Sequence, residues 1–596
     1  MLNIFTSKQE IVMLKIVLFL LSSFTSQNLF YCQNDLPNNR FVDWQANGSK
    51  LIDESEYQII ELANLGLDNS GQIDCSSIIN QLIVTHFFDS IILLFPAGQF
   101  RFEQTLQLKS NLILAGASME QTTLIFDLDG IGSSIEALGQ LNGIVLPISS
   151  MGFKGQSKLL CQNHDFAIGD WVRVACNDSL LVSSSWALGT VGQLIQISGI
   201  EADTLYLNSA LRRSYINEGG LYLQKIVPLS GIGIRCMTIR RLDDTAPSQQ
   251  SNLLLEGVVH TVIENVAFYN CTFSHIDART CSNITVRSCY FQDGFSYGGG
   301  GRAYGVVMQA TTNECLIENN IFKHLRHSIL LQSGANGNVI TFNYSTEPYW
   351  EEATLPANSS GELVLHGNYP YANLFEQNVV GNIVVDNSHG ANGPDNLFYR
   401  NRAYQYGIFF SDQTSPYQLL MGNHVTNTTF PYSLVNYTIQ GIGHYQFANN
   451  NKGSIVPAGT QFTYDTSFAY QFCPYFVMQN AWLSIGDQPP MLQYIPAQQR
   501  FLENNFLSNN CQSAGIQQQD LKQQICASPN PFSDKCIVSC DGKAISTLQL
   551  IDCNCKLLQT IAVQEAQFEL DMSAFESGLY FLKSTDGLHW CKLLKY

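Results

Sequence analysis

The segment at 316–345, "LIENNIFKHLRHSILLQSGANGNVITFNYS", contains a short pattern twice, as "IENNIF" at 317–322 and as "ITFNYS" at 340–345. Similar windows continue on both sides of it. Their fourth residues are Val266, Cys289, Asn320, Asn343, Asn378, Asn401 and Asn423. The successive separations are 23, 31, 23, 35, 23 and 22 residues. This spacing predicts a repeat of 23 residues that is interrupted by two insertions.

Each repeat is too short for a crossover through a helix, and it contains two or three apolar runs separated by Asn and Gly. Such a unit fits one turn of a parallel β-solenoid. Asparagines stacked at one corner of the coils can bond to one another along the stack. We therefore interpret the recurrent asparagines as scaffold and not as catalytic residues.

Composition limits the partners of this chain. It has 596 residues, 45% of them hydrophobic, which is enough for a large core in two or three domains. The formal net charge of -18 argues against binding of nucleic acid or anionic membranes. An acidic ligand must then be met by a local basic cluster or by a cation. Only 13% of the residues are charged, yet Lys323, His324, Arg326 and His327 fall within five positions.

The text "SIILLFPAGQFRFEQTLQLKSNLILAGASMEQTTLIF" at 90–126 contains an "FPAG" turn followed by "TLQL" and "NLILAG" strands. It resembles the opening coils of the pectate-lyase-like right-handed parallel β-helix superfamily. The preceding "DNSGQIDCSSIINQLI" is similar to the helix that caps the first coil in that superfamily. The resemblance covers roughly residues 55–505 and implies an all-β fold. It does not select a reaction, because the superfamily includes lyases, hydrolases, epimerases and non-enzymatic fibre proteins.

Both ends of the chain contain short motifs outside the repeat. "KQEIVMLKIVLFLLSSFTSQN" at 8–28 places lysines before a short apolar run and small residues, which predicts a signal peptide. At the other end, "ASPNPFSDKCIVSC" and "SGLYFLK" resemble the C-terminal sorting domain of type IX secretion. That resemblance implies a β-sandwich-like module, the outer-membrane secretion machinery as a partner, and a secreted or cell-surface location.

Alternating apolar positions in "FAIGDWVRVACND" and "VGQLIQISGIEADTLYLNSALRRSY" predict a small antiparallel β unit inserted in the solenoid. We interpret this unit as structural, with Arg212 and Arg213 as weaker candidates for ligand contact. The predicted organisation is a signal peptide at 1–25, an N-terminal cap with the first β-helix coils at 26–145, the inserted β unit at 146–235, a β-helix with a carbohydrate groove at 236–505, a linker at 506–525 and a C-terminal sorting domain at 526–596.

The strands that follow the asparagine corners align as "HIDAR", "GVVMQ", "SILLQ", "ELVLH", "NIVVD" and "GIFFS". Their second and fourth residues are mostly apolar and point inward by strand alternation. Their fifth residues form a predicted outward column: Arg279, Gln309, Gln332, His366, Asp386 and Ser411. One polar side chain per coil, about 5 Å apart, suits a linear polymer. The two insertions enter beside this column, where they are expected to form walls.

The densest polar text follows the same strands. The candidate catalytic residues are His366, Asp386, His389, Arg326, His327 and Arg302. The candidate substrate-binding residues are Lys323, Tyr304, Tyr369, Tyr371, Gln332 and Arg400. For the basic residues, a solvated corner with stems covering apolar surface is an equally simple interpretation.

Three functions fit these residues. A lyase acting on a uronate polysaccharide needs a base such as His366, His327 or Tyr304, together with positive charge from Arg302, Arg326 or Ca²⁺. A glycoside hydrolase needs paired carboxylates, for which Asp386 with Asp395 or Glu362 would serve. A binding protein needs the groove alone. We favour the lyase.

The metal requirement is left open. The spacing of His366, Asp386 and His389 matches no zinc motif, and Ca²⁺ is the cofactor that a uronate substrate would suggest. The predicted partners are a polysaccharide and the secretion machinery, without nucleic acid, and the chain is expected to be a monomer.

Overall fold

A computed structural model describes residues 36–507 except 46, 50–51, 149, 216–219, 245–248, 428–436, 463–465, 471–472, 478–481 and 487–492. It also describes residue 511 and the range 525–595 except 529–533, 541–546, 553–555, 564–566, 577 and 585–589. The predicted signal peptide and almost all of the predicted linker lie outside these residues. The chain forms two compact units, one mainly before Asn509 and one mainly after it.

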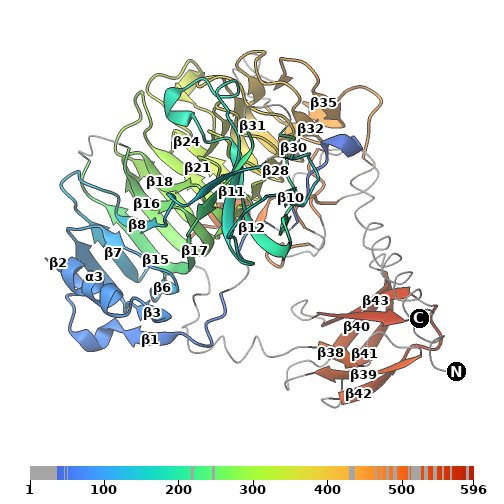
Figure 1. Cartoon of the computed structure of the whole chain (residues 1–596), viewed down its shortest axis with the longest axis horizontal. Helices are drawn as coiled ribbons and strands as arrows, with labels where there is room; N and C mark the ends of the chain where they lie inside the picture. The colour runs from blue at the N-terminus through green and yellow to red at the C-terminus, as the bar shows by residue number, and fades with distance from the viewer. Residues whose placement is uncertain are drawn as a thin grey trace. The chain divides into compact units, whose positions relative to one another are not determined.

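The first unit is a right-handed parallel β-helix, which confirms the predicted all-β fold class (Figure 1). Its coils contribute strands to three faces, and strands of neighbouring coils pair in parallel on each face. Face 1 contains β1 (Gln58–Glu61), β3 (Ile91–Leu94), β6 (Leu112–Ala115), the first parts of β15 (Leu229–Arg241) and β17 (Val258–Cys271), β19 (Ser282–Arg287), β22 (Leu316–Glu318), β25 (Val339–Thr341), β28 (Leu374–Glu376), β30 (Leu397–Tyr399), β32 (Leu419–Met421) and β35 (Tyr445–Phe447).

Face 2 follows face 1 along each coil. It contains β2 (Ser70–Asp74), β4 (Gly98–Phe102), β7 (Thr122–Phe126), the second parts of β15 and β17, β20 (Tyr290–Gly294), β23 (Ile321–Lys323), β26 (Tyr344–Thr346), the first parts of β29 (Val379–Val385) and β31 (Arg402–Phe410), β33 (His424–Val425) and β36 (Asn449–Asn451). The antiparallel strand β37 (Ser454–Val456) pairs with β36.

Face 3 carries the candidate site. It contains β5 (Leu106–Gln107), β8 (Ile135–Leu138), β16 (Ser251–Glu256), β18 (Ser274–Arg279), β21 (Tyr304–Gln309), β24 (His327–Leu331), β27 (Leu363–Leu365), the second parts of β29 and β31, and β34 (Tyr437–Thr438).

Helices are few among the described residues. The helix α3 (Ser76–Thr85) lies at the N-terminal end of the β-helix, as the resemblance to capping helices implied (Figure 1). It buries Ile79 and Ile83 in the main core. The helix α4 is short (Pro496–Leu502), and single 3₁₀ turns occur at η1 (Asn38–Arg40), η2 (Leu62–Leu65), η3 (Ser185–Ala187) and η4 (Pro356–Asn358).

The asparagines of the 23-residue repeat form a ladder at the corner between faces 1 and 2. The Nδ2 of Asn343 donates to Oδ1 of Asn378 at 3.0 Å, and Asn378 donates in the same way to Asn401 at 2.9 Å. Backbone N–H groups join the same oxygens, beginning with Cys289 N to Asn320 Oδ1 at 2.9 Å. These side chains are buried, which confirms that they are scaffold.

A second ladder, which the repeat alignment did not predict, lies at the corner between faces 3 and 1. Asn338 donates to Oδ1 of Asn373 at 2.9 Å, and Asn373 donates to Oδ1 of Asn396 at 2.9 Å. Asn396 donates in turn to Gln418 Oε1 at 3.0 Å. Two of the three corners are therefore held by side-chain amides, because the interior offers the turning backbone no water.

Inward-facing side chains fill the coils. The sixth residues of the first three repeat windows, Phe268, Phe291 and Phe322, stack with ring centroids 5.0 and 4.7 Å apart. They belong to one apolar cluster that extends from Leu62 to Val425. The buried cysteines of the repeat, including Cys271 and Cys289, are free thiols. The hydrophobic effect on this continuous core supplies the main driving force for stacking the coils.

The inserted unit is a six-stranded antiparallel sheet. Its strands are β9 (Val145–Pro147), β10 (Lys158–Leu160), β11 (Trp171–Ala175), β12 (Gly192–Glu201), β13 (Thr204–Leu207) and β14 (Tyr222–Ile226), in the order β10-β13-β12-β11-β14-β9. The parallel sheet resumes at Leu229 in β15, before the predicted boundary at residue 236, because β15 is one long strand that continues from face 1 into face 2.

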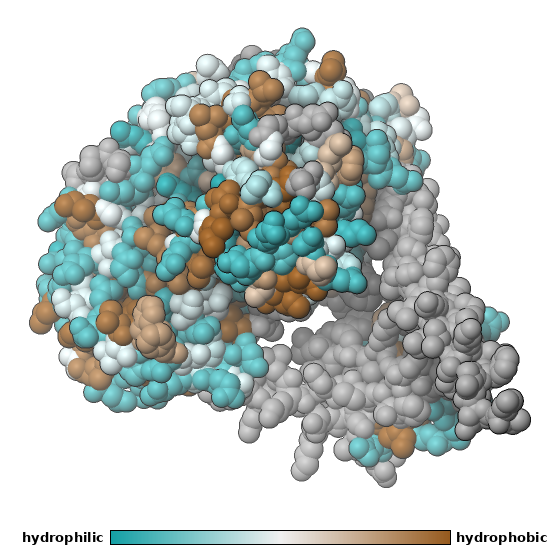
Figure 2. Space-filling model, viewed as in Figure 1, coloured by the Kyte–Doolittle hydropathy of each residue, from teal (hydrophilic) through white to brown (hydrophobic). Residues whose placement is uncertain are grey.

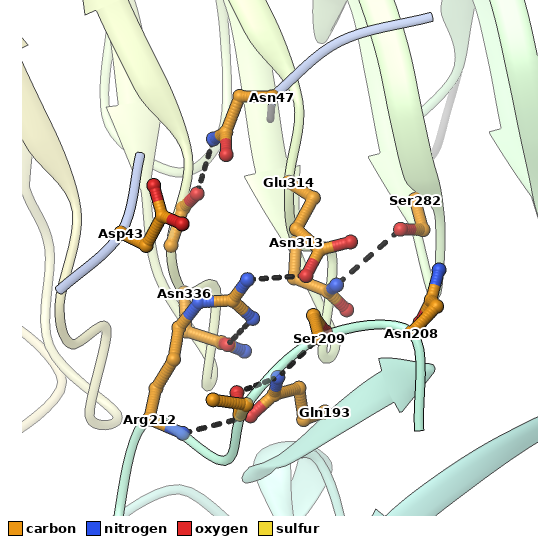
Figure 3. Close-up of polar contacts among 12 residues, drawn as sticks. Asp43, Asn47, Gln193, Asn208, Ser209, Arg212, Ser282, Asn313, Glu314 and Asn336 are labelled. Atoms are coloured by element: carbon orange, nitrogen blue, oxygen red, sulfur yellow. Dashed lines mark hydrogen bonds and ion pairs between the residues drawn. The ribbon is translucent and has the colours of Figure 1, made fainter. Parts of the chain in front are cut away.

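Polar contacts join the inserted unit to the β-helix (Figure 3). Arg212 forms an ion pair with Glu314 and donates to Oδ1 of Asn336 at 3.2 Å, while its backbone N–H donates to Gln193 Oε1 at 3.0 Å. Asn313 exchanges two hydrogen bonds with the backbone of Leu194, at 2.9 and 3.0 Å. Arg212 is therefore a buried structural residue.

The second unit contains two antiparallel sheets. One contains β38 (Ile525–Ser528), β39 (Lys535–Cys540) and β42 (Gln567–Asp571), and the other contains β40 (Thr547–Asp552), β41 (Leu557–Ala562), β43 (Gly578–Ser584) and β44 (Trp590–Lys595). Residues from both sheets share one apolar core. The "SGLYFLK" motif supplies β43, which lies between β40 and β44.

Candidate functional site

The strand register of face 3 places the predicted outward residues in one column. Arg279 pairs with Gln309, and the pairs of Leu331 with Leu365, Leu365 with Val385 and Val385 with Phe410 align the residues that follow them. We call this set the polar column: Arg279, Gln309, Gln332, His366, Asp386 and Ser411. It exists because side chains alternate across a strand and the repeat keeps the coils in register.

Three histidines and an aspartate meet around His366, which belongs to the polar column. The ring centroids of His327 and His366 are 5.8 Å apart, and those of His366 and His389 are 5.0 Å apart. The Nδ1 of His366 lies 2.7 Å from Oδ2 of Asp386. We call His327, His366, His389 and Asp386 the histidine cluster. The structure thus brings together four of the six residues that the sequence nominated for catalysis.

Asp386 orients His366. Burial alone would raise the pKa of the Asp386 carboxyl, but the charge and hydrogen bond of His366 and the backbone N–H of Ser388 outweigh burial, so the pKa lies below its ordinary value. An ionised Asp386 accepts a hydrogen bond from Nδ1 of His366, so the other ring nitrogen, Nε2, is directed away from the carboxylate. The side chain of His366 is 11% exposed, so this imidazole is shielded but reachable. The arrangement is that of a base held by a carboxylate.

The other two histidines are held neutral. Burial, together with Arg326 and His366, lowers the pKa of His327 to about 3, and its Nδ1 donates to Gly361 O at 2.7 Å. Burial and the neighbouring His366 also lower the pKa of His389. Neither group adds positive charge at neutral pH. Arg326, whose charge acts on His327, is a fixed cation beside the cluster.

Arg326 forms one wall of the site. Its guanidinium lies 5.6 Å from the ring centroid of Tyr304 and 4.6 Å from that of Trp350. Its Nη1 donates to Gly298 O at 3.0 Å and to Gly300 O. Its Nε is buried and has no hydrogen-bond partner among the described residues. Both predicted insertions therefore contact this arginine, one through its glycines and the other through Trp350.

Tyr304 lies between Arg326 and His327. Its ring centroid is 5.0 Å from that of His327. Burial raises the pKa of the Tyr304 hydroxyl, against the opposing effect of Arg326, so the group remains a proton-bearing donor and not a base.

The polar column continues away from the histidines as a chain of bonded side chains. Gln332 donates to Gln309 Oε1 at 2.8 Å, and Gln309 donates to Asp277 Oδ1 at 2.8 Å. Arg279 closes the chain on Asp277 at 2.6 Å. Burial raises the pKa of Asp277. Gln332, a predicted substrate-binding residue, therefore lies beside His366 in the column.

Two predicted residues lie apart from the cluster. Arg302 is exposed in its insertion, where its Nη1 donates to Ser296 Oγ at 2.9 Å. Lys323 ends β23 on face 2 and lies 3.7 Å from Glu347. The corner at residues 324–326 separates face 2 from face 3, so neighbours in the sequence occupy different faces of the coil.

Three further nominated residues lie outside the polar column. Arg400 is fully buried at the corner between faces 1 and 2, with its guanidinium 4.6 Å from the Phe462 ring and bonded to Ile485 O at 3.1 Å. Tyr371 is buried and donates to Gly192 O at 2.9 Å. Tyr369 lies beside Tyr371, with ring centroids 5.7 Å apart. These positions give Arg400 and Tyr371 packing roles. The Arg400 side chain is enclosed by Phe462 and Ile485, and the Tyr371 hydroxyl is bonded to the backbone of the inserted unit.

The carboxylates considered for a hydrolase are also separated from Asp386. Asp395 forms ion pairs with Arg40 and, at 2.8 Å, with Lys154. Glu362 points into the coil, where it accepts from Ser345 at 2.6 Å and from the Asn382 backbone at 2.9 Å.

Two aromatic or polar contacts of the cluster were missed by the sequence reasoning. Trp186 lies 5.3 Å from the His389 ring, centroid to centroid, and Ser184 Oγ lies 3.5 Å from His389 Nδ1. Both belong to the inserted β unit, which the alternation of apolar residues marked only as structural. The sequence feature that could have indicated these contacts is a tryptophan in the serine-rich segment "LLVSSSWALG" at 180–189.

Among the described residues, no group of three or more His, Cys, Asp or Glu side chains has a geometry that could hold a metal ion. Nor is any described helix long and apolar enough to cross a membrane.

A search of curated proteins finds no match to this chain. Solved structures give partial matches. A tailspike protein of Pseudomonas phage LKA1 is 13% identical, with a TM-score of 0.44, over 66% of this chain and 77% of that one. The A-module of a mannuronan C-5 epimerase from Azotobacter vinelandii is 12% identical, with a TM-score of 0.35, over 65% and 95%. An exopolygalacturonase from Thermotoga maritima is 11% identical, with a TM-score of 0.33, over 68% and 95%. At these scores the activities in those names stay with those proteins.

The C-terminal unit gives a match to a protein family. Residues 528–592 match the family described as "Secretion system C-terminal sorting domain". This range covers the second unit's strands from β39 to the start of β44, and it contains "SGLYFLK" and all of "ASPNPFSDKCIVSC" except its first residue, Ala527. The chain therefore carries a type IX secretion sorting domain behind a parallel β-helix, and it is a secreted or cell-surface protein.

Proposed function

We propose that the β-helix is a polysaccharide lyase that cleaves a uronate-containing polymer by β-elimination at the histidine cluster. The observation that carries this proposal is the pairing of His366 with Asp386, close to Arg326, whose charge acts on the neighbouring His327. A lyase needs a base, a positive group for the substrate carboxylate and a proton donor. His366 would be the base and would return the proton, and Arg326 would be the positive group.

Arg326 is suited to the uronate carboxylate. Its guanidinium is stiffened by Tyr304 and Trp350 and by the glycine carbonyls, so little side-chain entropy is lost when it binds an anion. Binding the carboxylate would stabilise the negative charge that develops when the α-proton leaves. Tyr304 keeps its proton and can donate a hydrogen bond to the same group.

His366 is suited to the proton transfer. Its Nε2 would take the proton from the carbon next to the carboxylate, and the C–H electron pair would become a carbon–carbon double bond. In a second step the bond to the leaving glycosidic oxygen breaks, with its electron pair going to that oxygen, and the oxygen takes the proton back from the His366 imidazolium. Asp386, ionised and 2.7 Å away, stabilises the imidazolium between the two steps.

The hydrolase alternative has less support. Paired carboxyl groups in glycosidases lie about 5 to 9.5 Å apart. Asp277 stands on β18 and Asp386 follows β29, four coils away, which at about 4.8 Å per coil is about 19 Å. Glu362 is directed into the core. A non-catalytic binding protein is still compatible with the polar column.

The test is a screen of the purified full chain against polygalacturonate, alginate and hyaluronate. Near-ultraviolet absorbance reports the unsaturated product that only β-elimination creates. We expect His366→Ala to reduce the rate by 10² to 10⁴-fold, because a positioned proton-transfer group typically contributes that much. His424→Ala is the matched control, since this histidine is also largely buried but lies on face 2.

Reducing ends released without the absorbance would favour a hydrolase, and binding with neither signal would favour a non-catalytic role. Wild-type rates in the His366 variant would refute this active site.

A further inference from the structure

The inserted β unit reaches the candidate site through one loop. The loop at 177–190 runs from β11 to β12 and carries the 3₁₀ turn η3 at its centre. Trp186 in this turn is 52% exposed, although its ring makes a T-shaped contact with the His389 ring at an interplanar angle of 86°. A tryptophan half in water beside a cluster of titratable groups has an apolar face available for a ligand.

Hydrogen bonds within the loop fix its shape. The buried carboxylate of Asp178 accepts from Gly189 N at 2.8 Å and from Val191 N at 2.9 Å. The carbonyl of the same Asp178 accepts from Leu181 N at 2.8 Å. Ala187, next to Trp186, is fully buried. The turn is therefore held in one conformation before any ligand arrives.

The loop is also docked on the coils of face 3. Asn368 Oδ1 accepts from the backbone N–H groups of Ser183 and Ser184 at 3.0 and 3.2 Å. At Gly390 the loop comes so close that a Cβ would lie 2.6 Å from Ser183 Oγ, and the φ of +78° there favours glycine as well. The residue next to Gly390 is His389. The loop is therefore seated on the coil segment that carries the histidine.

The base of the unit is anchored independently. Arg212, Asn313 and Asn336 join it to the coils in the contacts of Figure 3, and Tyr371 adds a bond to Gly192 O. In the view that Figure 1 and Figure 2 share, the surface over β10–β12 shows apolar residues among hydrophilic ones. A sheet held at its base and at its loop can position a side chain within fractions of an ångström.

We propose that Trp186 is a positioning residue that stacks on the sugar next to the one that reacts at His366. The proposal deepens the proposed function and rests on it for the nature of the polymer. The indole face is apolar and electron-rich, so it complements the C–H face of a pyranose ring. Ring centroids step 5.0 Å from His366 to His389 and 5.3 Å from His389 to Trp186. The three rings therefore form a series that leads from His366 in the polar column to the loop of the inserted unit.

The experiment measures retardation of the full chain in native gels that contain polygalacturonate, alginate or hyaluronate. Trp186→Ala should weaken the apparent affinity for the polymer that the wild type binds by about tenfold or more. Truncation of a tryptophan that packs against a ligand typically lowers affinity by this factor. Trp186→Phe should keep most of the affinity. Leu180→Ala is the matched control, because Leu180 lies in the same loop, is 96% exposed and is apolar.

On the polymer that is cleaved, Trp186→Ala should raise KM and leave kcat near the wild-type value, which a general structural defect would not do. An unchanged thermal midpoint checks that the variant is folded. Wild-type affinity and KM in Trp186→Ala would overturn the proposal even if the lyase activity is found. If Trp186→Ala weakens binding but the wild type forms no unsaturated product, the stacking role of Trp186 is supported and the lyase is refuted. If the wild type binds none of the three polymers, the stacking role of Trp186 is refuted.

Discussion

Replacing Asn378 by alanine tests the asparagine ladder that holds the coils in register. Asn378 lies in the middle of the ladder. Its Nδ2 donates to Ile340 O at 2.8 Å and to Asn401 Oδ1 at 2.9 Å, while its Oδ1 accepts from the backbone N and the Nδ2 of Asn343, both at 3.0 Å. The substitution removes four buried hydrogen bonds and leaves the Asn343 backbone N–H without a partner.

The expected loss follows from these four bonds. At about 1 kcal/mol for each bond, the free energy of unfolding should fall by about 4 kcal/mol, and the orphaned buried N–H adds to that loss. Asn387→Ala is the matched control, because Asn387 is exposed and its side chain bonds to Asp412 and Ser411 of the neighbouring coil. This control should cost less than about 1 kcal/mol.

The assay is unfolding in guanidinium chloride, followed by far-ultraviolet circular dichroism on the full chain. The β-helix contains most of the strands, so it dominates the signal. An Asn378→Ala loss no larger than that of Asn387→Ala would refute the idea that the ladder stabilises the coils.

Two further predictions concern pH and export. Burial raises the pKa of Glu362 and of Glu376 from 4.5 to about 7, so the folded state keeps protons that the unfolded state releases. Each group should therefore add about 3 kcal/mol to the free energy of unfolding below about pH 4.5. This contribution should be lost as the pH rises to about 7. The thermal midpoint should fall over this range and fall less in Glu362→Gln, and an equal fall in the variant would contradict the assignment. Deleting residues 526–596 should leave the β-helix folded, because its core contains no residue of that segment, but should stop surface delivery. Fractionation of cells that express the truncated chain checks this, and normal delivery would contradict it.

The sequence by itself determined the repeat and what the repeat requires. A period of 23 residues with asparagine at one position means that each coil repeats the geometry of the last, so the ladder from Asn320 to Asn423 and the column from Gln309 to Ser411 both follow from counting. Asn338, Asn373 and Asn396 show the same intervals of 35 and 23 residues as the first ladder, and the same counting would have predicted the second one.

Only the tertiary structure decided which polar residues meet in the site. Lys323 and Arg326 are close in sequence, but Lys323 ends the strand on face 2 and Arg326 lies at the end of the corner that leads to face 3. Arg400 is enclosed by Phe462 and Ile485, which lie 62 and 85 residues further along the chain.

Trp186 lies about 200 residues before His389, in a unit that the repeat does not include. A repeat specifies neighbours along the stack because backbone hydrogen bonds set the spacing of the coils. Where insertions fold back, and which side chains they cover, depends on packing between segments whose separation in the chain carries no period.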